Sequence, residues 1–225
     1  MEAFSGCRLQ GIHLPKGIRQ IPADCFSGTA LTEITIPDSV RTICDHAFSR
    51  CRNLERVVLP AGLRTIEEHA FSDCTKLWDV NLSPQTSVGA GAFDFCSALA
   101  GKDGFVVVDG MLFGSPALSD CGEVFLPERV RVIKSGSIDM QKGMSAVIHI
   151  PKSVEEIESF AFSGDIRQVV SESAAAFGIC SLHGCSRLQS LVVPEGTEVS
   201  ENAFGFDEKD GKLRSRLTVK YSTAR

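Results

Sequence analysis

The chain has 225 residues, of which 43 % are hydrophobic and 23 % are charged, and its formal net charge is −5. This composition is that of an ordinary soluble protein with enough apolar side chains to build a core. The acidic excess argues against a surface for nucleic acid or anionic lipid, because such a surface requires a basic stripe. No segment approaches the roughly 18 consecutive apolar residues of a membrane helix, so we expect no membrane insertion.

The chain starts inside a sequence motif that is repeated along it. Residues 1–7 contain neither the basic start nor the apolar centre of a signal peptide. They contain an Ala-Phe step that recurs later, so we expect that the front of a longer protein, with any signal or anchor, is missing.

The phenylalanines of this Ala-Phe step stand at residues 4, 26, 48, 71 and 93, in steps of 22, 22, 23 and 22. A fixed period between about 20 and 50 residues predicts a solenoid.

A short strand that ends in proline recurs with the same period. In Leu54–Leu59 apolar and exposed positions alternate, and Pro60 ends the strand because proline cannot donate to a ladder. This step occurs at 12–15, 34–37, 57–60, 80–84, 124–127, 148–151 and 191–194. Its prolines are 22, 23, 24, 43, 24 and 43 residues apart, and each long step equals two repeats. We therefore predict a single solenoid of about nine turns over residues 1–225.

The other side of each turn carries the Ala-Phe step. We predict that this step starts a short helical or 3-10 turn, as at 45–48 and 67–71, with its phenylalanine in the core. The fold class is therefore an α/β repeat: a β-rich solenoid with parallel strands on one face and short helical or 3-10 turns opposite. Stacked turns bury a continuous core that a single turn cannot cover.

Two regions depart from the period. In residues 101–123, glycine-rich turn signals surround two apolar runs at 105–108 and 111–113, and we predict a β-hairpin-like irregular repeat there. Residues 205–225 end in the alternating segment Arg216–Tyr221. We interpret them as a C-terminal capping strand region, because terminal repeats need a polar outer side.

The nine cysteines do not match the even-numbered framework of a small disulfide-rich protein. Four of them, Cys7, Cys51, Cys74 and Cys96, each lie three residues after a repeat phenylalanine. This spacing predicts buried free thiols, which pack as small hydrophobic side chains. A disulfide between stacked neighbours is the alternative, but stacked side chains point the same way, so we favour a ladder of thiols.

No group of residues predicts catalysis, a cofactor or a metal. Gly89–Phe93 lacks the third glycine of a dinucleotide-binding loop. Cys180–Cys185 holds two cysteines and a histidine at ligand-like spacing, but a structural zinc site needs a fourth ligand and none is near. The repeat period explains Cys44–His46 better than a catalytic Cys-His pair does. We therefore predict that the protein is not an enzyme, and we interpret the sequon Asn81–Ser83 as a coincidence.

The combined pattern resembles a known family. The phrase LxxIxIPxxVxxIxxxAFxxCxxL stands at 31–54 and 54–77, and less cleanly at 9–31 and 188–204. It resembles the BspA-like leucine-rich repeats, and GFVVVDGMLF at 104–113 resembles a segment often seen between such repeats. The resemblance implies a leucine-rich-repeat solenoid. It also implies a bacterial or protist protein, secreted or exposed at the cell surface, that adheres to host matrix proteins or other cells.

The outward side of the parallel strands is the candidate binding face. Side chains of a strand point alternately to its two faces. If Val57 and Leu59 point inward, Arg56 and Val58 therefore point outward. The same step gives the candidate set His13, Glu33, Thr35, Arg56, Val58, Asp79, Asn81, Phe125 and His149, and it also turns outward Gly11, Glu123, Val147, Ser190 and Val192. Solenoids use such faces for binding, so we predict a protein ligand, either an extracellular-matrix or a cell-surface protein.

Two further expectations concern assembly. A structural spacer or surface-layer repeat with no ligand of its own is the alternative function. The open N-terminal repeat would expose unpaired strand edges, and we expect end-to-end self-association there.

Overall fold

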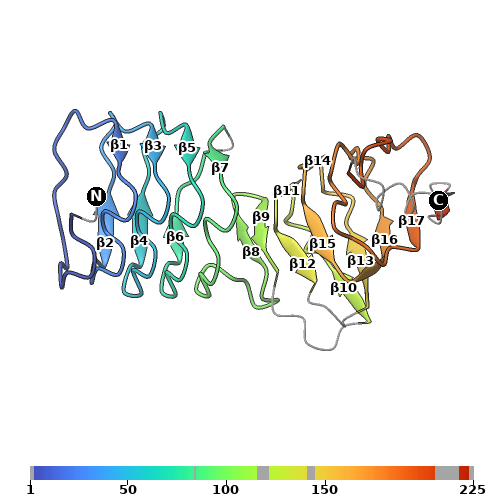
Figure 1. Ribbon diagram of the computed structural model, residues 1–225, viewed down its shortest axis with the longest axis horizontal. Helices are drawn as coiled ribbons and strands as arrows, with labels where there is room; N and C mark the ends of the chain where they lie inside the picture. The colour runs from blue at the N-terminus through green and yellow to red at the C-terminus, as the bar shows by residue number, and fades with distance from the viewer. Residues whose placement is uncertain (1–2, 84, 116–121, 141–144, 206–217, 223–225) are drawn as a thin grey trace. The chain divides into compact units, whose positions relative to one another are not determined.

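The computed structural model describes residues 3–83, 85–115, 122–140, 145–205 and 218–222. They divide into two compact units, Met1–Asp109 and Gly110–Arg225. In each unit, short parallel strands from successive turns lie side by side (Figure 1). The described turns form a β-solenoid and number about seven, and the count of about nine over residues 1–225 stays a prediction. Within the described ranges, no helix is long and apolar enough to cross a membrane.

The first unit holds two parallel sheets, with the orders β2-β4-β6 and β1-β3-β5-β7. Their strands are β2 (Glu33–Thr35), β4 (Arg56–Val58), β6 (Asp79–Val80), β1 (Gln20–Ile21), β3 (Thr42–Ile43), β5 (Thr65–Ile66) and β7 (Ser87–Val88). In the first of these sheets Ile34 pairs with Val57, and Val57 pairs with Val80. Equivalent residues of successive repeats thus stand side by side, which confirms the predicted parallel strands.

The second unit repeats this arrangement with longer strands. Its main sheet has the order β10-β13-β16-β17-β18 and is parallel throughout. The strands of this main sheet are β10 (Glu123–Phe125), β13 (Ala146–Ile150), β16 (Ile166–Ser171), β17 (Ser190–Pro194) and β18 (Thr218–Ser222). A further sheet contains β9 (Met111–Gly114), β11 (Val132–Ile133) and β14 (Glu156–Ile157). The strands β12 (Ile138–Met140) and β15 (Phe162–Gly164) form a separate pair.

Two strands stand where the sequence predicts a hairpin. The first unit ends with β8 (Val106–Val108), and β9 follows two residues later. Asp109 and Gly110 between them have φ angles of 48° and 80°, and positive φ at both central residues is typical of a type I′ turn. The irregular repeat at 101–123 and the capping region at 205–225 stay predictions, since both include residues outside the described ranges.

The predicted helical or 3-10 turns at 45–48 and 67–71 are wrong. The described residues contain no helix, and the Ala-Phe step is a series of turns instead. The reason lies in the backbone: His46 and Arg50 have φ angles of 54° and 60°. A right-handed helix needs negative φ at consecutive residues, so left-handed residues two positions before and two positions after the phenylalanine interrupt it.

Backbone amides of the Ala-Phe step alternate between two kinds of hydrogen bond. The Phe48 amide donates to the Ala70 carbonyl of the next turn at 2.8 Å, and the Arg50 amide donates to the Ser72 carbonyl at 2.8 Å. Between them, the Ser49 amide donates to the His46 carbonyl at 3.0 Å and closes a local turn. The Ala-Phe step is therefore paired to the next repeat, as a strand would be.

The repeat phenylalanines form one continuous stack in the core of the first unit. Successive ring centroids are 5.4, 5.3, 5.2 and 5.5 Å apart, with interplanar angles between 2° and 9°, along Phe4, Phe26, Phe48, Phe71 and Phe93. These separations lie within the range of favourable aromatic contacts. The period of about 22 residues in the sequence is thus the spacing that places each ring on the previous one.

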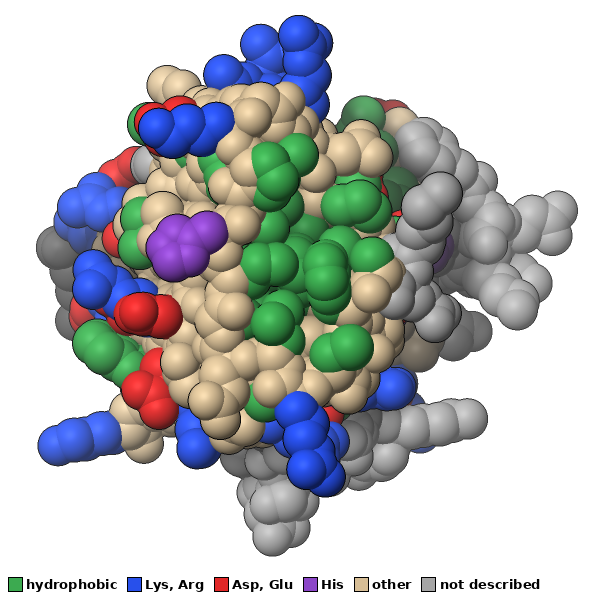
Figure 2. Space-filling model, turned by 90° about the vertical axis from the view of Figure 1, so that its left-hand side faces the viewer, with side chains coloured by type: hydrophobic (Ala, Val, Ile, Leu, Met, Phe, Trp, Pro, Cys, Tyr) green, Lys and Arg blue, Asp and Glu red, His purple; other side chains and the backbone are tan. Residues whose placement is uncertain are grey.

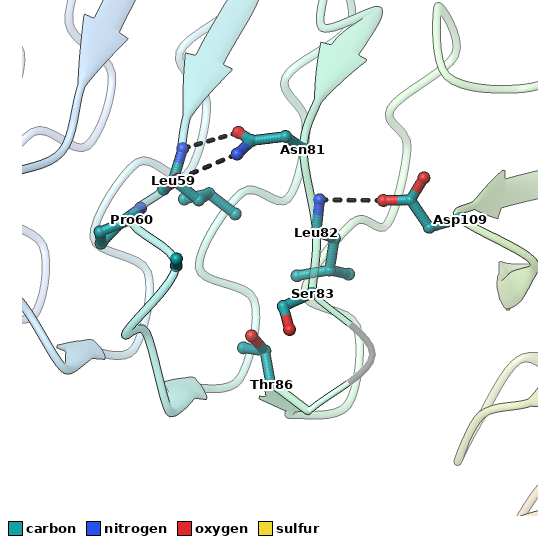
Figure 3. Close-up of a pocket in the computed structure, with 8 residues that line it drawn as sticks. Leu59, Pro60, Asn81, Leu82, Ser83, Thr86 and Asp109 are labelled. Atoms are coloured by element: carbon teal, nitrogen blue, oxygen red, sulfur yellow. Dashed lines mark hydrogen bonds between the residues drawn. The ribbon is translucent and has the colours of Figure 1, made fainter. Parts of the chain in front are cut away.

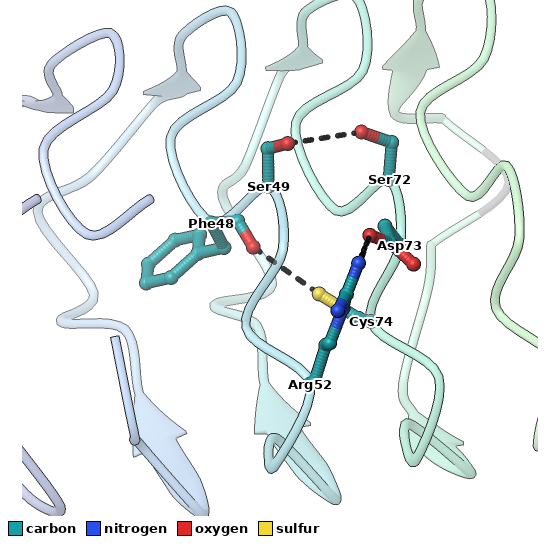
Figure 4. Close-up of polar contacts among 6 residues, drawn as sticks. All are labelled: Phe48, Ser49, Arg52, Ser72, Asp73 and Cys74. Atoms are coloured by element: carbon teal, nitrogen blue, oxygen red, sulfur yellow. Dashed lines mark hydrogen bonds and ion pairs between the residues drawn. The ribbon is translucent and has the colours of Figure 1, made fainter. Parts of the chain in front are cut away.

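A ladder of thiols runs beside this stack. The thiols of Cys51, Cys74 and Cys96 donate hydrogen bonds to the carbonyls of Phe26, Phe48 and Phe71, over 3.0, 3.2 and 3.1 Å. Figure 4 shows the bond from Cys74 to Phe48. All three cysteines are fully buried and free, as predicted. Cys7 is the exception, because it belongs to the first described turn and is exposed.

The surroundings of these thiols change their acidity in two directions. Burial raises the pKa of Cys96 to about 12 and that of Cys185 in the second unit to about 12. The hydrogen bond with Cys74 lowers the pKa of Cys51 to about 7, so full burial alone protects that thiol. A thiolate is the nucleophile in alkylation, so thiols with raised pKa and no exposure react slowly.

We expect iodoacetamide at pH 8 to label Cys7 rapidly in the folded protein, whereas Cys51, Cys74, Cys96 and Cys185 react only after denaturation. Site-resolved mass spectrometry without reductant measures this difference. Equal labelling of Cys7 and Cys96 in the native state would contradict the buried ladder. Resistance of the buried cysteines to alkylation even in denaturant would indicate disulfides instead.

Phe95 provides a test of the left-handed turns. It is 77 % exposed and has a φ angle of 58°, a region that favours glycine. We expect Phe95→Gly to raise the free energy of unfolding by about 1 kcal/mol, because it relieves a left-handed conformation. Denaturant titration measures the change, and Phe95→Ala, which keeps a Cβ, is the matched control. A Phe95→Gly protein less stable than the alanine control would refute this account.

Candidate functional site

The candidate binding face follows the alternation predicted from the sequence. On β2, Glu33 and Thr35 are exposed while Ile34 between them is buried. On β4, Arg56 is exposed and Val58 is partly exposed, while Val57 is buried. Neighbouring turns are held in register, so these outward side chains form rows across the first sheet.

A hollow of about 650 Å³ lies on this face of the first unit. It is lined by Gly11, Ile12, His13, Leu14, Lys16, Glu33, Ile34, Thr35, Pro37, Arg56 and Val58. Five of the nine candidate residues therefore meet in one place, although they come from three successive repeats. The lining combines apolar side chains with both signs of charge.

A row of charges crosses the same face. Glu33 pairs in register with Arg56, and Arg56 with Asp79. The Arg56 guanidinium Nε lies 2.9 Å from Asp79 Oδ2, and both side chains are solvent-accessible. Such an exposed ion pair contributes about 0–1 kcal/mol to stability. Its main effect is to hold Arg56 in a defined position beside the hollow.

Asn81 is exposed on the candidate face and also has a structural role. Its Oδ1 accepts a hydrogen bond from the Leu59 amide at 2.8 Å, and its Nδ2 donates to the Leu59 carbonyl at 3.0 Å (Figure 3). The Asp109 carboxylate likewise accepts from the Leu82 amide at 3.0 Å. These side chains continue the ladder just past the end of β6, beside a smaller hollow of about 250 Å³. The amide of Asn81 is thus occupied, which fits the interpretation of its sequon as a coincidence.

The last two candidates, Phe125 and His149, lie together in the second unit. Their rings stack with centroids 4.2 Å apart and an interplanar angle of 10°, because Phe125 pairs with His149 in register. His149 Nε2 is buried, lacks a hydrogen-bond partner among the described residues, and lies 3.7 Å from Glu123 Oε2. Phe125 remains 62 % exposed, so the pair presents an aromatic surface.

Val147 does not join this face, contrary to the alternation of the sequence. It is buried, as are both of its neighbours Ala146 and Ile148. The register between β13 and β16 shifts between Ala146 and Val147, and such a bulge changes the direction of a side chain. The period of two therefore fails at this residue.

Several residues near the hollows were missed from the sequence. Lys16 and Glu128 each follow a repeat proline, and Glu172 stands at the end of β16, which has no proline. Lys16 and Glu128 could have been predicted from the prolines that end the strands, because each directly follows one. Trp78, which directly precedes β6 and is 62 % exposed, is a further outward aromatic side chain that was not predicted.

The described histidine, cysteine, aspartate and glutamate side chains do not come together as the ligands of a metal ion. In the part of the chain that the structure describes, no three His, Cys, Asp or Glu side chains are placed to hold a metal ion. Cys180 and Cys185 are buried, whereas His183 is exposed and meets the ring of Phe160 edge-on at 5.4 Å. His46 and His69 stack at 5.2 Å on successive turns, as their repeat positions require.

Comparison with known proteins identifies the repeat. The family model for the BspA type leucine-rich repeat region matches residues 1–101 and 114–209 with six copies. The chain belongs to this family. Its hollows and charge rows therefore lie on the strand face of a BspA type leucine-rich repeat protein. No curated protein matches the chain.

Solved structures of leucine-rich repeat proteins are similar to the chain in fold. A leucine rich cell surface protein from Faecalibacterium prausnitzii A2-165 is 22 % identical, with a TM-score of 0.46 over 90 % of this chain and 62 % of that one. The leucine rich repeat protein of T. pallidum is 21 % identical, with a TM-score of 0.39 over 92 % of this chain and 81 % of that one. The BspA type chain thus spans less than two thirds of the Faecalibacterium protein.

We expect Asn81→Ala to lower the free energy of unfolding by about 1–3 kcal/mol, because the amide and carbonyl of Leu59 both lose their partner. Urea denaturation followed by circular dichroism measures the change. Thr35→Ala, on the same face, is the control and should stay within about 0.5 kcal/mol of the native protein. An Asn81→Ala protein as stable as this control would show that the side-chain ladder does not contribute.

Proposed function

We propose that this chain is a protein-binding leucine-rich-repeat module that acts in adhesion or in contact with host or cell-surface proteins. The observation that carries the proposal is the 650 Å³ hollow on the first unit, where His13, Glu33, Thr35, Arg56 and Val58 meet. These side chains extend from strands whose backbones are paired on successive turns. A surface built in this way is already ordered before binding, so little conformational entropy is lost when a partner docks.

The chemistry of the hollow favours a protein over other ligands. Apolar groups such as Leu14 and Val58 stand beside the charges of Lys16, Glu33 and Arg56. Mixed apolar and charged lining suits a folded or extended polypeptide. A polyanion such as nucleic acid would instead require a predominantly basic surface, and the chain carries a net charge of −5. We also propose a location at the cell surface or outside the cell, with which membership of the BspA type family is compatible, and no enzymatic role.

The test is binding of the purified chain to an array of extracellular-matrix and cell-surface proteins. We expect at least one partner whose affinity falls about tenfold or more in the variant Arg56→Ala/Val58→Ala, because central contact residues carry most binding energy. The matched control is Arg64→Ala/Thr65→Ala, which changes the same repeat on the other sheet of the first unit. Binding that both variants weaken equally, or no binding at all, would contradict the proposal.

A structural role is the second candidate, and the end of the first unit favours it. Figure 2 views this end and shows hydrophobic side chains gathered at its centre. Phe4 is 38 % exposed, and Leu9, Ile12, Leu14 and Ile18 are only partly buried although they belong to the repeated core pattern. A second copy of the chain that stacks against this end would bury them, as successive turns do within the unit.

If this role operates, the chain should associate reversibly as its concentration rises. Sedimentation velocity between about 5 and 500 µM measures the association, since weak apolar contacts have micromolar dissociation constants. Phe4→Glu should shift the species toward the monomer, because it places a charge in the contact. Cys7→Ser, which changes an exposed residue of the same turn, is the control. A chain that remains monomeric throughout this range would exclude self-association through this end.

A further inference from the structure

A second hollow, on the strand face of the second unit, has chemistry of its own. Its volume is about 330 Å³. It is lined by Phe125, Leu126, Pro127, Glu128, His149, Ile150, Pro151, Val170 and Glu172. These residues come from three neighbouring turns, those of β10, β13 and β16.

The floor of this hollow is apolar and held in place. Phe125 stacks on His149 at 4.2 Å, and His149 pairs in register with Val170. Beyond the end of β10, the Leu126 amide donates to the His149 carbonyl at 2.9 Å, which extends the ladder toward Pro127. The floor is therefore a continuous strip of rings and aliphatic groups on a fixed backbone.

The rim carries charges of a single sign. Glu128 and Glu172 stand on the first and third of the three turns, two strand spacings or about 10 Å apart along the ladder. Both are exposed, and among the described residues neither forms an ion pair with a cation. Arg129 follows Glu128 in sequence, and Lys152 follows Pro151 on the middle turn, as Glu128 follows Pro127 on the first turn. Neither cation is among the residues that line the hollow. An apolar floor between two unpaired carboxylates is complementary to a long side chain with an apolar stem and a cationic head.

We propose that this hollow receives an arginine or lysine side chain from a protein partner, an inference that rests on the proposed function of the strand face. The aliphatic stem lies along Val170 and the stacked rings of Phe125 and His149, as long cationic side chains commonly do on apolar surface. The head lies between Glu128 and Glu172. Arginine is the better fit, because its planar guanidinium both stacks on rings and donates to two carboxylates.

The experiment titrates the isotopically labelled full chain with three probes and follows the methyl resonances of Ile150 and Val170 by NMR. The probes are acetyl-Gly-Arg-Val-Arg-Gly-amide, its counterpart with glutamate in place of arginine, and chitotriose. We expect only the arginine peptide to shift these resonances in a saturable way. Glu128→Gln/Glu172→Gln should weaken that binding about tenfold, because the cation loses both charged partners. Glu195→Gln is the matched control, since Glu195 also follows a strand end on this sheet but does not line the hollow.

The outcomes separate this inference from the proposed function. Equal shifts with the glutamate peptide or with chitotriose, or arginine-peptide binding that Glu128→Gln/Glu172→Gln leaves unchanged, would overturn the cationic site. A matrix protein that binds through Arg56 and Val58, with no arginine-peptide shift, would overturn the inference and leave the proposed function standing. A saturable arginine-peptide shift with no protein partner in the array would support the site and count against the adhesion role.

Discussion

The structure depends on one constraint, which is that each turn hydrogen-bonds to the next in a fixed register. The amide of Phe48 must meet the carbonyl of Ala70, just as Ile34 must meet Val57 on the strand side. A repeat one residue too long is tolerated only where a local turn absorbs it, and this explains repeats of 22 and 23 residues side by side. Within each unit, the core and the candidate binding face result from equivalent residues of successive repeats that stand side by side.

The core shows how this register replaces a large globular interior. Rings stack on rings at 5.2–5.5 Å, and the buried thiols of Cys51, Cys74 and Cys96 each donate to the carbonyl of the preceding turn's phenylalanine. The same geometry pairs Arg52 with Asp73 at the surface over 2.7 Å, and the buried Ser49 with Ser72 over 3.1 Å (Figure 4). Polar and apolar groups therefore follow the same rule, since both find their partners one repeat away. This arrangement lets short strands of two or three residues persist.

Much of the fold could be predicted from the sequence because it is periodic. The parallel strands, the outward Glu33 and Thr35, and the buried Cys51, Cys74 and Cys96 all follow from spacing alone. The Ala-Phe turns could not, because residue type does not reveal that a histidine or arginine adopts positive φ. The prediction that Val147 points outward was wrong because of a tertiary feature, the bulge between β13 and β16.

The candidate site was predictable only in part for a related reason. Alternation places Arg56, Phe125 and His149 correctly, but hollows also need the turns that follow each strand, and these contribute Lys16, Glu128 and Glu172. Asn81 shows a second limit of sequence alternation. It stands at an outward position yet gives both polar atoms to the backbone of Leu59, so an outward position alone does not define a binding residue.

The most direct test of the register is NMR measurement of scalar couplings across hydrogen bonds. The account predicts couplings from the Phe48 amide nitrogen to the Ala70 carbonyl carbon, and from the Phe26 amide nitrogen to the Ala47 carbonyl carbon. A coupling from the Phe48 nitrogen to a carbonyl three or four residues earlier in the chain would indicate a helical turn instead. That result would contradict the turn-to-turn ladder on which the strand face is built.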